Sequence, residues 1–135
     1  MAASFQTIWH EDSSATVLGR LTARNGSGAY TGRQGEGRWL KEVDITSITC
    51  NVFDRSSATP DTPFATPTIN VATAIFDSPE INNQLWTKDK IGWNFLVDLA
   101  PSNFPTEDHQ IEVEFKVTLT DATVFFGSYI GVVEG

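Results

Sequence analysis

The feature that most constrains the fold is a strict alternation of apolar and polar residues in the last third of the chain. From Ile111 to Leu119 every second residue is apolar, and the positions between them hold Glu112, Glu114, Lys116 and Thr118. Successive side chains of a β-strand point to opposite faces of the sheet. The pattern therefore predicts a strand with one buried face and one face in water.

Shorter versions of this pattern recur along the chain, separated by residues that favour turns. We expect further strands at 5–9, 15–23, 45–54, 68–71, 74–76, 91–99 and 124–133, and a hairpin turn at 120–123. The proline-rich stretch 56–67 predicts a loop or an edge segment, because proline lacks the donor that a sheet interior needs. Short strands without a long helix predict one all-β domain over residues 1–135: an antiparallel β-sandwich, immunoglobulin-like, with a small β-barrel as the alternative.

The strand expected at 124–133 is apolar on both of its faces. One face carries Val124, Phe126, Ile130 and Val132, and the other carries Phe125, Tyr129 and Val133. The final strand of an isolated sandwich normally has one solvated face. Either a neighbouring subunit or the chain's own loops would cover the second face, and both explanations stay open. We take Phe125 and Tyr129 as candidate contact residues.

The stretch 26–37, GSGAYTGRQGEG, holds five of the ten glycines. It lacks the lysine and hydroxyl pair of a phosphate-binding loop, and no helix is expected after it to meet a pyrophosphate. Residues 20–41 carry five basic side chains and one acidic side chain, a charge of +4, whereas the rest of the chain carries −12. We expect a basic arm or loop at about 24–41, able to reach on the order of 60 Å if extended, with these contact residues: Arg24, Tyr30, Arg33, Arg38 and Trp39.

Two triplets, His10-Glu11-Asp12 and Glu107-Asp108-His109, contain the residue types that bind divalent cations. If the two segments meet, His10, Asp12, Asp108 and His109 are candidate metal ligands; the alternative is that they are solvated turn residues. Cys50 lies on the apolar face of an expected strand, and both histidines stand beside acidic residues in expected turns. The sequence therefore predicts no catalytic site and no cofactor, so the protein is not expected to be an enzyme.

Composition limits the partners. A net charge of −8 and an isoelectric point near 4.5 argue against nucleic acid. No apolar run approaches the roughly 20 residues of a membrane helix, so no membrane partner is expected. The first twelve residues lack the basic and apolar regions of a signal peptide, and we expect a protein made in a cytoplasm.

Three segments together resemble small β-rich structural proteins of tailed bacteriophages and prophage-like elements. They are Val43–Asp54 (VDITSITCNVFD), Trp86–Asp89 with Gly92–Phe95, and His109–Thr120 followed by Asp121. The resemblance implies an immunoglobulin-like, non-enzymatic virion protein: a capsid decoration protein, a head–tail connector or neck protein, or a tail component. Its partners would be other virion proteins and copies of itself, and its location the virion, assembled in the host cytoplasm. The alternative is a module that binds glycans or cell surfaces on a fibre or spike, with Trp39 or Trp86 exposed in a groove.

Overall fold

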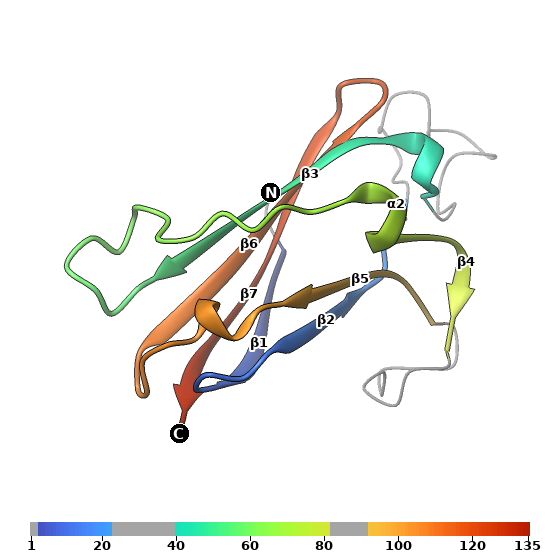
Figure 1. The fold of residues 1–135 in the computed structure, drawn as a ribbon. Coiled ribbons are helices and arrows are strands. Elements are labelled where there is room, and N and C mark those ends of the chain that lie inside the picture. The colour runs from blue at the N-terminus through green and yellow to red at the C-terminus, as the bar shows by residue number, and fades with distance from the viewer. Residues whose placement is uncertain (1–2, 23–39, 82–91) are drawn as a thin grey trace.

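Two β-sheets face each other across one hydrophobic core in the computed structural model, which describes residues 3–22, 40–81 and 92–135. The first sheet has the order β1-β7-β6-β3 and the second has the order β2-β5-β4 (Figure 1). The first sheet contains β1 (Ala3–His10), β7 (Val124–Glu134), β6 (Gln110–Leu119) and β3 (Ile45–Asp54), and the second contains β2 (Ala15–Gly19), β5 (Trp93–Leu99) and β4 (Ile75–Glu80). The expected all-β sandwich is confirmed, and the barrel alternative is wrong because the two sheets are separate.

Strand direction differs from the expectation at one place. β3, β6 and β7 pair antiparallel, as the hairpin turn at 120–123 requires, but β1 runs parallel to β7. A tight hairpin would have forced antiparallel pairing. The turn after β1 instead leads to β2 in the other sheet. No hairpin therefore joins β1 to its neighbour β7, and the two strands can run parallel. That the sandwich is immunoglobulin-like stays a prediction.

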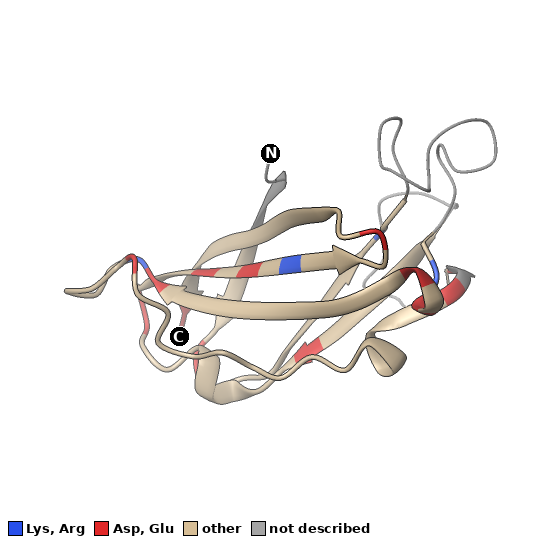
Figure 2. Cartoon of the chain, turned by 90° about the horizontal axis from the view of Figure 1, so that it is seen from above, with Lys and Arg blue, Asp and Glu red and all other residues tan. Residues whose placement is uncertain are grey.

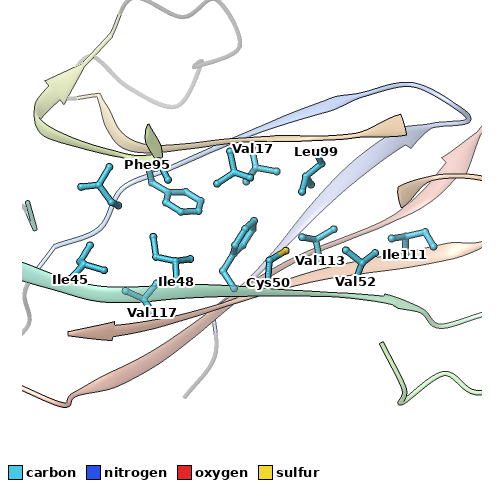
Figure 3. Close-up of a cluster of buried hydrophobic side chains, with 14 of the residues drawn as sticks. Val17, Ile45, Ile48, Cys50, Val52, Phe95, Leu99, Ile111, Val113 and Val117 are labelled. Atoms are coloured by element: carbon cyan, nitrogen blue, oxygen red, sulfur yellow. The ribbon is translucent and has the colours of Figure 1, made fainter. Parts of the chain in front are cut away.

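The core lies between the inner faces of the two sheets (Figure 3). The alternating residues 111–119 supply one wall, and Phe115 meets Phe95 of the opposite sheet edge-on, with ring centroids 5.1 Å apart. Cys50 of β3 is 2 % exposed in this core and behaves as the small hydrophobe expected. Burial, and to a smaller extent the charge of Glu114, raises the pKa of the Cys50 thiol to about 12. Cys50 therefore carries no thiolate near neutral pH.

Trp9 attaches the end of β1 to this core. Its indole N–H donates to the Ile111 carbonyl oxygen at 3.0 Å, and its ring stacks on Phe104 at 4.6 Å between centroids. Phe104 follows η3 (Pro101–Asn103), a short 3-10 turn after β5. Gly131 lets β1 approach β7 closely, since a Cβ atom at that position would collide with the Thr7 carbonyl oxygen.

The proline-rich stretch covers the outer edge of β3. Val52 N–H donates to the Ala65 carbonyl oxygen at 2.8 Å, and Phe64 N–H donates to the Val52 carbonyl oxygen at 2.9 Å. The expected edge segment is thereby confirmed. The strand expected at 68–71 is wrong, because Thr68 makes only an isolated bridge to Thr49. A single helical turn, α2 (Val71–Ala74), follows instead and is capped by the Asn70 side chain.

The other predicted boundaries need smaller corrections. The second strand ends at Gly19 rather than at residue 23, and β4 begins at Ile75 and runs to Glu80. A short 3-10 turn, η2 (Glu42–Asp44), precedes β3. At the hairpin tip Ala122 adopts a positive φ of 72°, a conformation that glycine accepts without strain.

Candidate interaction surface

The two apolar faces of β7 differ in burial: one packs against the core and the other carries solvent-exposed side chains. Phe125 and Tyr129 point inward and pack partly buried against the core. Tyr129 also donates its hydroxyl hydrogen to the Leu18 carbonyl oxygen of the opposite sheet at 3.0 Å, and burial raises its pKa to about 12. These two candidate contact residues therefore belong to the inside of the sandwich. Their role in contacting a partner stays a prediction.

The opposite face of β7 is mostly apolar and carries solvent-exposed side chains on both sides of Ser128, which is buried at 4 % exposure. Val124 is 41 % exposed, Phe126 37 % and Val132 45 %, and Ile130 is half-buried. β1 extends this surface, because Ile8 is paired with Val132 in register and is 58 % exposed. We call this set the apolar strip: Ile8, Val124, Phe126, Ile130 and Val132. Exposed apolar patches that stay contiguous on a folded protein mark contacts with other molecules.

β6 lines one side of the apolar strip with charged residues. Its outward side chains Glu112, Glu114 and Lys116 stand opposite Ile130, Ser128 and Phe126 of β7. Along β7 itself no charged residue occurs between Val124 and Val133. The outer faces of β7 and β6 therefore form one surface with an apolar row and a charged row side by side.

Arg55 neutralises one of these charges. Its Nε and Nη2 atoms donate to a single carboxylate oxygen of Glu112 at 2.8 and 2.6 Å. The same guanidinium donates to Asp61 and to the Pro60 carbonyl oxygen, and it lies 4.3 Å above the ring of Phe53. Both side chains of the Arg55–Glu112 pair are largely buried, at 26 % and 17 % exposure. The contacts fix the proline-rich stretch against the outer face of β3 and lower the net negative charge there.

The apolar strip and its charged row stand out against the rest of the molecule. The described residues hold fifteen acidic and four basic side chains, a net charge of −11, and red segments far outnumber blue ones in Figure 2. Two of the four basic residues, Arg55 and Lys116, adjoin the outer face of β6, where they stand against Glu112, Glu114 and Asp61. This face therefore has little net charge on a strongly acidic body.

The base of the glycine-rich segment is also fixed. Leu40 N–H donates to the Leu21 carbonyl oxygen at 3.0 Å, so the chain leaves and returns at one point. Asn94, 0 % exposed, accepts from Leu21 N–H at 2.7 Å and donates to the carbonyl oxygens of Leu21 and Leu40 at 3.0 and 2.9 Å. Apart from Leu40 and Lys41, the arm or loop expected at about 24–41 lies outside the described residues.

The two acidic triplets do lie at the same end of the sandwich. Glu107 N–H donates to the Glu11 carboxylate at 3.1 Å, and Asp108 N–H donates to the Val133 carbonyl oxygen at 2.8 Å. His109 does not face His10, however, because its Nδ1 atom pairs with Asp54 at 2.7 Å. Asp12 and Asp108 adopt positive φ angles of 53° and 69°, as turn residues do. Within residues 3–22, 40–81 and 92–135 no three potential ligands come together to hold a metal ion.

The remaining candidates lie outside the described residues. They are Arg24, Tyr30, Arg33, Arg38, Trp39 and Trp86. In the described part of the chain no helix is long and apolar enough to cross a membrane. The sequence analysis had identified Val124, Phe126, Ile130 and Val132 as one of two apolar faces of this strand, but it did not choose them as contact residues and it missed Ile8.

Comparison with known proteins adds no relative. No model of a protein family matches the chain, no curated protein matches it, and no solved structure matches its fold.

Proposed function

We propose that the protein is a non-enzymatic structural component of a tailed-phage virion or phage-like particle, and that it works by contacting other subunits. The observation that carries the proposal is the apolar strip, an exposed row of large aliphatic and aromatic side chains on the outer face of β7 and β1. Burying such side chains against a partner is worth roughly 25 cal/mol per Å² of apolar surface. A protein whose task is to bind its neighbours needs a surface of this kind.

Two further observations support the assignment. The sequence motifs of phage structural proteins fall on the core strands β3, β5 and β6 and on the segment before β5, so the resemblance follows the fold. The sheet orders A-G-F-C and B-E-D result when the strands are lettered in chain order. Immunoglobulin sandwiches pair C, F and G in one sheet and B, E and D in the other, so the order supports the immunoglobulin-like assignment. In this chain the first strand, A (β1), pairs with strand G (β7).

The proposal is tested on particles from the organism that encodes the chain. Phage or phage-like particles, purified on a density gradient, are expected to contain the protein. Val132→Asp is expected to remove it from the particles, because a carboxylate in the apolar strip opposes burial against a neighbour. Val43→Asp is the matched control, since Val43 is 77 % exposed on η2 and lies outside the apolar strip. Absence of the wild-type protein from intact particles would contradict the proposed function.

A further inference from the structure

The charge pattern around the apolar strip points to a particular partner. A basic protein would be drawn to the acidic surfaces that make up most of the body, whereas a second copy of this chain is repelled by them. Two such copies therefore approach most easily through a face that carries little net charge. On the outer face of β6 and β7 Arg55 pairs with both Glu112 and Asp61 and Lys116 follows Glu114 two residues along the same strand, so two basic side chains stand against three acidic ones.

The size of the apolar strip fits a reversible pairing. From the exposed fractions of its side chains, it offers roughly 300–400 Å² of apolar surface, as large as the largest patch that a typical monomer carries. A stable dimer buries about 800 Å² per partner, of which somewhat more than half is apolar. The strip supplies most of that apolar part, and the charged row of β6 supplies polar surface beside it.

We propose that two copies pack face to face through the outer faces of β6 and β7, related by a two-fold axis that crosses the strands at the level of Phe115 and Gly127. This inference rests on the proposed function as a protein that contacts other subunits, and it identifies one of those subunits as a second copy of the same chain. These two residues are opposite each other in the β6–β7 register. Rotation about that axis brings β7 over β7 of the second copy in the reverse direction, and β6 over β6.

This axis gives complementary contacts on both strands. On β6, Glu114 of each copy faces Lys116 of the other, so the pair occurs twice. On β7, Val124 faces Ile130 of the other copy, and Phe126 lies over Ser128, which its own chain already buries to 4 % exposure. Packed sheets lie about 10 Å apart, a separation that side chains of the size of Phe126 and Ile130 span. In a two-fold interface each such contact is made reciprocally.

The test is a charge exchange, read by sedimentation or by size-exclusion chromatography with light scattering on the purified protein. The wild type is expected to dimerise reversibly. Glu114→Lys or Lys116→Glu alone places like charges opposite each other twice and is expected to weaken dimerisation by about tenfold or more. The double exchange, Glu114→Lys with Lys116→Glu, restores the pairs and is expected to return affinity to within about threefold. Melting temperature verifies that each variant is folded.

Phe126→Asp is expected to abolish the dimer, while Phe64→Asp, at an exposed phenylalanine on the proline-rich stretch, leaves it intact. A wild type that stays monomeric at several hundred micromolar would overturn the proposal, and so would a double exchange no better than either single variant. If the wild type is monomeric but is found in particles, and Val132→Asp removes it from them, the pairing is refuted and the proposed function stands. If the wild type dimerises but is absent from particles, the pairing stands and the proposed function is refuted.

Discussion

Replacing Asn94 tests whether a single buried amide holds the base of the glycine-rich segment. Asn94→Ala removes three hydrogen bonds at a site with 0 % exposure. Leu21 N–H and the Leu40 carbonyl oxygen lose their Asn94 partner, whereas the Leu21 carbonyl oxygen keeps its bond from Leu40 N–H. An unsatisfied buried polar group costs about 1–3 kcal/mol. We therefore expect Asn94→Ala to lower the free energy of unfolding by about 3–5 kcal/mol.

Asn103 provides the matched control. It is also a buried asparagine, at 4 % exposure, but its amide donates to the Ala100 carbonyl oxygen within its own turn. Asn103→Ala is expected to cost about 1 kcal/mol, the net value of one ordinary hydrogen bond. Both variants are measured by urea unfolding followed by tryptophan fluorescence, with a common m-value. If Asn94→Ala costs no more than Asn103→Ala, the three bonds do not hold the two chain segments together.

Asn94→Asp tests the hydrogen-bond donor of Asn94 separately from the shape of its side chain, because aspartate has nearly the same shape but, when ionised, cannot donate. The carboxylate still accepts from Leu21 N–H, but its second oxygen points at the Leu21 and Leu40 carbonyl oxygens, which are also acceptors. Only the protonated acid can donate to one of them, so the folded state raises the pKa of the introduced carboxyl group. A raised pKa gives stability that is present at low pH and is lost as pH rises above the unfolded value, near 4. The Asp variant is therefore expected to approach wild-type stability at about pH 4 and to lose it by about pH 7. An equal deficit at both pH values would refute the reasoning.

Two further predictions concern the core and the final hairpin. Between about pH 8 and 10 the protein is expected to lose about 1–2 kcal/mol of unfolding free energy, because the unfolded chain ionises Cys50 and Tyr129 while the folded chain, with both pKa values raised to about 12, does not. Cys50→Ala should remove more than half of that loss in parallel urea titrations, and an unchanged slope would count against it. Ala122→Gly should raise stability by about 1 kcal/mol, because Ala122 has a φ of 72°. Ala100→Gly, at an exposed alanine with an ordinary φ of −67°, should instead lower stability, and a gain in both variants would refute the argument.

The sequence predicted the long strands well because their patterns are local. Residues 48–52 and 111–119 alternate cleanly, and the structure places their apolar members in the core. The strand expected at 68–71 failed because a capping residue, Asn70, begins a helical turn there. The parallel direction of β1 had no local signal at all. It follows from a turn that crosses between the sheets, a property of the assembled fold.

The apolar residues of the interaction surface could be predicted from the sequence, but the arrangement of charges beside them could not. The two apolar faces of 124–133 indicated a covered strand, but alternation cannot tell which face meets the core when both are apolar. Tyr129 reveals the answer only through its hydrogen bond to Leu18, a partner 111 residues away in the chain. Likewise Arg55 and Glu112 are 57 residues apart, and pairing of β3 with β6 is what brings them together. The low net charge of this face on an acidic body therefore arises from strand register, and a surface suited to meeting its own copy depends on contacts that no linear motif contains.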